Sequence, residues 1–126
     1  PDLLPPLACA CAFDPNPCRI AGTAHARIKE CDRPAVLARI FKAVGIPVDE
    51  RPDGLDFPGG GGKVANLGFY GILEDEDDHR MAMAAGLISL KIPGVKTQNP
   101  GCVSKSYPGF WEDLARLKTI KRPLGE

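Results

Sequence analysis

Basic side chains stand at the start of three predicted helices. They belong to the segments KECDRP at 29–34, DDHR at 77–80 and SKSYP at 104–108. The first turn of a helix presents unpaired N–H groups and a partial positive charge, so it attracts anions and is not stabilised by a basic residue. A cation repeated at three helix starts therefore predicts a site for a phosphate or a carboxylate. The alternative is solvated surface charge, with Asp32 and Asp78 as ordinary N-caps.

Carboxylates adjoin these cations. Glu30 directly follows Lys29, and Asp2 lies at the beginning of the given sequence. A carboxylate beside a cation can act as a general base or a general acid. The alternatives are a surface ion pair of little energetic weight for Glu30 and a frayed chain end for Asp2. His79 could titrate near neutral pH, or it could act as a structural hydrogen-bond donor.

The cysteines and histidines do not follow a metal-binding pattern. Five cysteines occur, at positions 9, 11, 18, 31 and 102, without a CxxC pair, and His25 and His79 are distant in the sequence. This pattern predicts no zinc site, and it predicts reduced, buried or partly buried thiols in a reducing compartment.

The composition does not favour a nucleic-acid-binding or membrane protein. The 126 residues include 16 basic and 16 acidic side chains, so the formal net charge is zero and no global field favours nucleic acid or an anionic membrane. No apolar run approaches the roughly 20 residues of a membrane span. Hydrophobic residues make up 44% of the chain, which is ordinary for a globular protein, and the length suits one domain.

Periodicity and turn signals predict an α/β fold with helices covering a sheet. The clearest helix begins with Pro34, after a cap at Asp32 or Arg33, and stops at Gly45. Pro52-Asp53-Gly54 indicates the turn of a β-hairpin. The first half of the expected order is a helix at 3–13, a strand over 18–28, the helix from 34, strands at 46–50 and 55–57, and a flexible loop at 59–62. It continues with a strand within 63–73, a helix at 80–90, a strand at 94–98 and a helix at 109–118, before a loose basic tail from 119.

Four segments, taken together, resemble the EPSP synthases, a branch of the enolpyruvyl transferase family. KECDR at 29–33 is similar to the family motif K-E-[ST]-D-R, and DHRMAM at 78–83 is similar to D-H-R-[MI]-A-M. CVSKSYPGFW at 102–111 is similar to the signature C-x-x-K-[ST]-[FY]-P-x-[FY]-[FW], and Pro1-Asp2 before an alanine-rich helix is similar to the family's P-D helix start. Order and spacing agree from Pro1 to about Leu117, and the motifs favour this branch over the UDP-N-acetylglucosamine enolpyruvyl transferases.

The resemblance implies a partial domain. Residues 1–126 would form part of the C-terminal domain of the two-domain enolpyruvyl transferase fold, in which repeated βαβαββ units pack helices against mixed sheets. The N-terminal domain, which supplies further phosphate-binding residues, would be absent. Because substrates of the family bind in the cleft between the domains, the isolated chain is expected to be inactive until it is joined to the N-terminal part of the enzyme.

The resemblance also implies a reaction and its residues. Members of the family transfer the enolpyruvyl group of phosphoenolpyruvate to the 5-hydroxyl of shikimate 3-phosphate, without a cofactor, a metal, a nucleic acid or a membrane. Bacterial members are cytoplasmic and plant members are plastid proteins. By motif, the catalytic residues would be Asp2, Lys29 and Glu30. Phosphoenolpyruvate would be bound by Glu30, Arg33, His79, Arg80 and Lys105. Shikimate 3-phosphate would contact Asp2, His25 and Lys29.

Some positions depart from the family pattern. Cys31 stands where Ser or Thr is usual, His25 stands where many members carry Asn, and the glycine-rich stretch 58–76 matches loosely. The alternative function is a non-catalytic anion-binding or interaction domain with the same fold. Retention of all the motif residues together favours the enzyme over this alternative.

Overall fold

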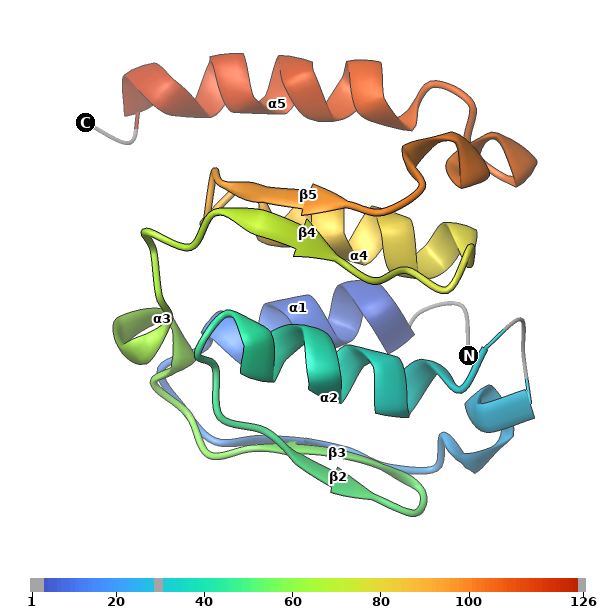
Figure 1. Ribbon diagram of the computed structural model, residues 1–126. Helices are drawn as coiled ribbons and strands as arrows, with labels where there is room; N and C mark the ends of the chain where they lie inside the picture. The colour runs from blue at the N-terminus through green and yellow to red at the C-terminus, as the bar shows by residue number, and fades with distance from the viewer. Residues whose placement is uncertain (1–3, 29–30, 125–126) are drawn as a thin grey trace.

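The computed structural model describes residues 4–28 and 31–124, and Figure 1 shows how their helices and strands are arranged. The α-helices are α1 (Leu4–Phe13), α2 (Arg33–Ala43), α3 (Gly61–Val64), α4 (His79–Ile88) and α5 (Phe110–Leu124). The 3-10 helices are η1 (Ala24–Ile28) and η2 (Pro100–Lys105). The strands are β1 (Cys18–Ile20), β2 (Asp49–Arg51), β3 (Gly54–Phe57), β4 (Gly71–Leu73) and β5 (Val95–Thr97).

Helices α1, α2 and α4 pack against one another in the middle of the molecule. An antiparallel sheet of order β1-β3-β2 lies on one side of them, and the parallel pair β4-β5 and helix α5 follow on the other side (Figure 1). The main core cluster fills the space between these helices and the sheets, and a smaller cluster joins α4 to η2 and α5. The predicted α/β class, with helices packed against sheets, is confirmed.

Helix α2 follows its sequence signals closely. Asp32 is the N-cap, and its carboxylate accepts a hydrogen bond from the backbone N–H of Ala35 at 3.2 Å. Pro34 occupies the first turn, where its missing N–H leaves no intrahelical bond unmade. Gly45, just beyond the helix, has a φ of +83°, a conformation that glycine adopts without steric cost. The predicted helix and both of its ends are therefore confirmed.

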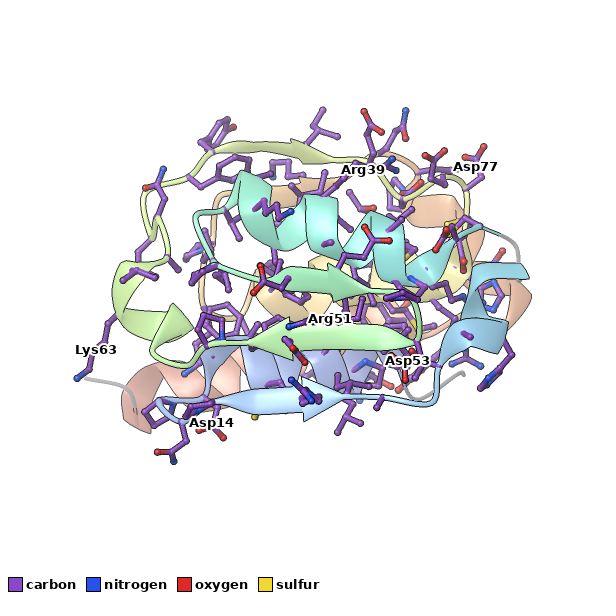
Figure 2. The ribbon with its side chains drawn as sticks, turned by 90° about the horizontal axis from the view of Figure 1, so that it is seen from below. Asp14, Arg39, Arg51, Asp53, Lys63 and Asp77 are labelled. Atoms are coloured by element: carbon purple, nitrogen blue, oxygen red, sulfur yellow. The ribbon has the colours of Figure 1, made fainter. Side chains whose placement is uncertain are left out.

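The predicted hairpin is also confirmed. Strands β2 and β3 pair in register from Asp49 opposite Asp56 to Arg51 opposite Gly54. Figure 2 shows Asp53 at the hairpin turn, and its carbonyl accepts hydrogen bonds from the N–H and hydroxyl of Thr23. Strand β1 pairs with the other edge of β3, so the hairpin is tied to the segment that leads into α2.

Three local predictions were wrong in extent. The strand expected over 18–28 ends at Ile20, and η1 follows it. The loop expected at 59–62 contains the start of α3, since Gly60 takes a left-handed conformation (φ +71°) that begins a helical turn. The tail expected to be loose continues α5 to Leu124.

The strand expected within 63–73 covers only Gly71–Leu73. Val64, Leu67 and Tyr70, which suggested a longer strand, are 60%, 58% and 82% exposed. Their apolar spacing therefore does not reflect a buried face of a strand. In the part of the chain that the structure describes, no helix has the length and apolar character needed to cross a bilayer.

Gly61 permits a close approach between α3 and α1. A Cβ atom on Gly61 would lie 1.9 Å from the carbonyl oxygen of Ala12, whereas one on Gly68 would meet only the Asn66 side chain at 3.6 Å. We expect Gly61→Ala to lower the free energy of unfolding by about 1–3 kcal/mol, because the backbone of α1 or α3 must shift. Gly68→Ala is the matched control and should change it by less than about 0.5 kcal/mol. Equal urea-unfolding midpoints for the two variants would contradict this packing.

Candidate functional site

The starts of the main helices meet at one end of the molecule. Figure 1 shows that α1, α2 and α4 all begin at the same end, where η1 and η2 also lie. Strands β4 and β5 are parallel, so their carboxyl ends point the same way, and α4 connects them. Ligands of α/β proteins commonly bind beyond the carboxyl ends of parallel strands. The predicted anion-binding segments thus converge on the expected end of the fold.

A buried ion pair joins two of these segments. The Nε of Arg33, at the start of α2, donates to Oδ2 of Asp78 at 2.9 Å, and Nη2 donates to Oδ1 at 3.3 Å. The Arg33 side chain is 1% exposed and the Asp78 side chain is 0% exposed. The two-bond geometry fixes the plane of the guanidinium against the carboxylate. The KECDR and DHR motifs, 45 residues apart from Arg33 to Asp78, are therefore in direct contact.

Asp78 accepts two further hydrogen bonds. The backbone N–H of Arg80 donates to Oδ1 at 2.8 Å, which makes Asp78 the N-cap of α4, and the thiol of Cys31 donates to Oδ2 at 3.2 Å. Burial on its own would raise the pKa of Asp78, but the hydrogen bonds from Arg33, Cys31 and the Arg80 backbone together hold it below its ordinary value. Asp78 is therefore an anion over the physiological pH range.

The loop before α4 is held by a second buried carboxylate. Asp75 is 0% exposed, and its Oδ2 accepts hydrogen bonds from the hydroxyl of Thr97 and the backbone N–H of Asn99, both at 2.6 Å. Its Oδ1 accepts from the N–H of Asp77 at 2.9 Å. Glu76 and Asp77 adopt left-handed backbone conformations (φ 52° and 55°), which are uncommon outside glycine. Asp75 thus ties the loop that carries Asp78 to the end of β5.

The structure brings together some of the predicted site residues. Arg33, His79 and Arg80 surround Asp78, and Nδ1 of His79 lies 3.9 Å from Asp78 Oδ1. Lys105 is the last residue of η2, which packs against α4, although its side chain lies outside the described part. His25 is exposed on η1. Asp2, Lys29 and Glu30 lie outside the described residues, so their predicted roles stay predictions.

Sequence reasoning missed the residues that support this cluster. Asp78 was considered as an N-cap, which the structure confirms, but not as the ion-pair partner of Arg33, and Asp75 was not singled out. No sequence signal links Asp75 to Thr97 and Asn99, because the contact depends on the pairing of β4 with β5. Among residues 4–28 and 31–124, no three His, Cys, Asp or Glu side chains lie close enough to hold a metal ion.

Similarity to solved structures defines the class of protein. An EPSP synthase from Acinetobacter baumannii has the same fold over this region, with a TM-score of 0.77 and 29% identity, covering 90% of this chain and 26% of that one. The fold, with cationic helix starts gathered at one end, is that of the enolpyruvyl transferases.

The chain belongs to the EPSP synthase family. The family model described as "EPSP synthase (3-phosphoshikimate 1-carboxyvinyltransferase)" matches residues 1–114. A 3-phosphoshikimate 1-carboxyvinyltransferase of Syntrophobacter fumaroxidans is 38% identical over 119 residues, and one of Synechococcus sp. (strain WH7803) is 41% identical over 118 residues. These matches cover 94% and 93% of this chain but only 27% and 26% of the relatives, so the chain spans about a quarter of their length.

The Asp78 contacts predict an acid-dependent loss of stability. A carboxyl whose pKa is lower in the folded than in the unfolded chain stabilises the fold above its ordinary pKa of 3.8, and that contribution disappears as the pH falls through the lower native value. We therefore expect the difference in free energy of unfolding between the unaltered chain and Asp78→Asn to be large at pH 7 and to shrink below pH 3.8. Urea unfolding across this range measures it, and a pH-independent difference would contradict the ion pair.

The environment of Cys31 predicts an unreactive thiol. Burial, with the neighbouring charge of Asp78, raises the pKa of Cys31 to about 12. Because the thiolate is the nucleophile, we expect alkylation by iodoacetamide at pH 8 to be at least ~100-fold slower in the folded chain than in urea. Peptide mass spectrometry measures the two rates, and similar rates would mean that Cys31 does not donate to Asp78.

Proposed function

We propose that this chain supplies the C-terminal part of an active site that transfers the enolpyruvyl group of phosphoenolpyruvate to the 5-hydroxyl of shikimate 3-phosphate. The observation that carries the proposal is the buried pair of Arg33 and Asp78, because it joins the KECDR and DHR segments at the starts of two helices. Residues 1–126 would be a partial C-terminal domain. The bacterial relatives support a cytoplasmic reaction.

The cations of the cluster would bind phosphoenolpyruvate. This substrate carries a phosphate and a carboxylate, and a planar guanidinium can donate two parallel hydrogen bonds to either group. Asp78 accepts hydrogen bonds from the Arg33 guanidinium and from the backbone N–H of Arg80, and His79 precedes Arg80 in the first turn of α4. The start of α4 adds the partial positive charge of its backbone. Lys105 would complete the set from η2.

The acid–base steps would belong to Asp2, Lys29 and Glu30. Asp2 would accept the proton of the attacking 5-hydroxyl, and Lys29 would contact the same substrate together with His25. Glu30 would exchange a proton with the enolpyruvyl methylene. Addition gives a tetrahedral ketal, and elimination then restores the double bond and releases phosphate. The cations would stabilise the charge that develops on the departing phosphate, which is electrostatic stabilisation by groups already in place.

The proposal requires a partner. The chain spans about a quarter of the relatives' length, so the remaining parts of the shikimate 3-phosphate site would come from the N-terminal part of the enzyme. Closure of the two parts over the substrates would exclude water and complete the site. The isolated chain is therefore expected to lack activity. No cofactor is required by the proposed chemistry.

Phosphate release tests the proposal. Phosphoenolpyruvate and shikimate 3-phosphate are incubated with the chain alone and with the chain plus the N-terminal part of an EPSP synthase such as that of Syntrophobacter fumaroxidans. We expect release only in the second mixture. Turnover by the chain alone would overturn the shared site, and no turnover in either mixture would favour the non-catalytic anion-binding domain.

Substitution of Arg80 tests the anion site within the reconstituted enzyme. Arg80→Ala should weaken phosphoenolpyruvate binding by about 1.5–3 kcal/mol, the typical contribution of a hydrogen bond to a charged group. The matched control is Arg51→Ala, because Arg51 makes an exposed ion pair with Asp56 on the antiparallel sheet and belongs to none of the anion-binding motifs. Figure 2 shows Arg51 on this sheet. An Arg80→Ala enzyme with the KM of the Arg51→Ala enzyme would count against the assigned role.

A further inference from the structure

We infer that Asp78 is a positioning residue of the proposed phosphoenolpyruvate site, where one buried carboxylate orients Arg33 of α2 and the first turn of α4 together. The inference rests on the proposed function for the identity of the anion. The contacts that carry it are independent of that function, because they are made within this chain: Asp78 receives donors from Arg33, Cys31 and the backbone of Arg80.

These donors occupy all the hydrogen-bond acceptor positions of the Asp78 carboxylate. Each of its oxygens accepts two hydrogen bonds: Oδ1 from Arg80 N and Arg33 Nη2, and Oδ2 from Arg33 Nε and Cys31 Sγ. An ionised carboxylate offers about four acceptor positions, so little rotational freedom remains. Because the group is also completely buried, water cannot replace any of these partners without opening the structure. Asp78 therefore fixes the first residues of α2 and α4 relative to one another.

The ion pair fixes the orientation of the Arg33 guanidinium. Asp78 occupies the edge formed by Nε and Nη2. The Arg33 side chain is 1% exposed, so the guanidinium has little room to turn away from this contact. The direction of the guanidinium plane is set by the plane of the Asp78 carboxylate. A change at Asp78 would therefore alter the angle at which Arg33 meets the substrate.

The main chain of Asp78 is held as firmly as its side chain. Its N–H donates to the carbonyl oxygen of Asp75 at 2.8 Å, and the Asp75 carboxylate is bonded to Thr97 and Asn99 at the end of β5. The two left-handed residues between them leave a single tight path for the loop. The pairing of β4 with β5 thus determines where the Asp78 carboxylate lies. Through its hydrogen bonds, the carboxylate then positions Arg33 and the backbone of Arg80.

Cys31 supplies a neutral donor to the same carboxylate. Its thiol lies 3.2 Å from Asp78 Oδ2, and it stands two residues before Arg33 in the sequence. A hydroxyl or a thiol at this position can satisfy the carboxylate without adding a charge that would compete with Arg33. Cys31 thus makes a small contribution to the orientation of the Asp78 carboxylate. Its substitution should change the orientation of Arg33 less than removal of the Asp78 charge does.

The positioning role predicts a particular kinetic defect. In Asp78→Asn, the buried Arg33 cation loses the negative charge of Asp78, so a bound anion would still be attracted to it. The orientation of the guanidinium is no longer fixed, however, and misplacement by about 1 Å can cost on the order of 100-fold in rate. We therefore expect kcat of the reconstituted enzyme to fall about 10- to 100-fold, with less than about a threefold change in the KM for phosphoenolpyruvate.

The first measurement needs no activity. In the 126-residue chain without substrates, two-dimensional NMR of arginine Nε–Hε groups should show a slowly exchanging, shifted signal for Arg33, assigned by its loss in Arg33→Lys. Asp78→Asn should move this signal and increase its exchange with water by at least ~10-fold. Cys31→Ser should perturb the signal less than Cys31→Ala does. A signal that is unaltered in Asp78→Asn would overturn the inference, whether or not the proposed function holds.

The second measurement is a kinetic double-mutant cycle in the reconstituted enzyme. Lysine cannot form the two-bond contact, so Asp78→Asn should cost much less kcat in an Arg33→Lys background than in the unaltered chain. Asp56→Asn is the matched control, since Asp56 also lies between two arginines, Arg19 and Arg51, but these two arginine side chains are exposed. If Asp78 were only a helix cap, the two effects on kcat would multiply independently, and the inference would be overturned.

The two measurements separate failure of the inference from failure of the proposed function. An inactive reconstituted enzyme with the expected NMR changes would remove the assigned reaction and leave the positioning of Arg33 supported. An active enzyme in which Asp78→Asn lowers only the melting temperature would leave the reaction supported and overturn the positioning. Should Asp78→Asn fail to fold, the Cys31→Ala and Cys31→Ser pair decides, with kcat expected to fall about two- to fivefold for alanine and less for serine.

Discussion

The buried ion pair between Arg33 and Asp78 governs the end of the molecule where the helices begin. Two helix starts brought together place two partial positive charges side by side, and Arg33 adds a full one. Without an anion between them this arrangement would be unfavourable, since a lone buried charge is costly and cannot reach water. Asp78 meets the requirement from within the chain by accepting donors from both helices. Asp78 therefore supplies the negative charge that the two helix starts and Arg33 require.

The rest of the fold serves to hold this pair in register. The antiparallel sheet and η1 lead into α2, and the parallel strands lead into α4 and η2. Asp75 fixes the loop before α4 by bonding to the residues that follow β5. Close backbone contacts, such as that of Gly61 with Ala12, set the distance between layers. Each of these contacts contributes little stability alone. Together they restrict the movement of α2 relative to α4.

Membership of the EPSP synthase family suggests which anion this arrangement would bind. The proposed substrate carries both a phosphate and a carboxylate, and Arg33, His79 and Arg80 would be its partners in this chain. The chain covers only about a quarter of its relatives, so the proposed site would be shared with another part of the enzyme. A preorganised half-site is useful in that setting, because the cations need not reorganise when the cleft closes.

The sequence by itself determined the local elements with strong signals and the identity of the motif residues. The helix from Pro34, the hairpin at Pro52 to Gly54 and the helix after Asp78 follow from caps, turn residues and periodicity, which act over a few residues. The family motifs predicted that Arg33, His79, Arg80 and Lys105 bind phosphoenolpyruvate. The sequence misjudged 59–73, where exposed apolar residues imitate a strand. Only the tertiary structure decided that Arg33 is buried and that Asp78 and Asp75 hold the site, because hydrogen bonds across 22 to 45 residues depend on strand pairing and helix packing.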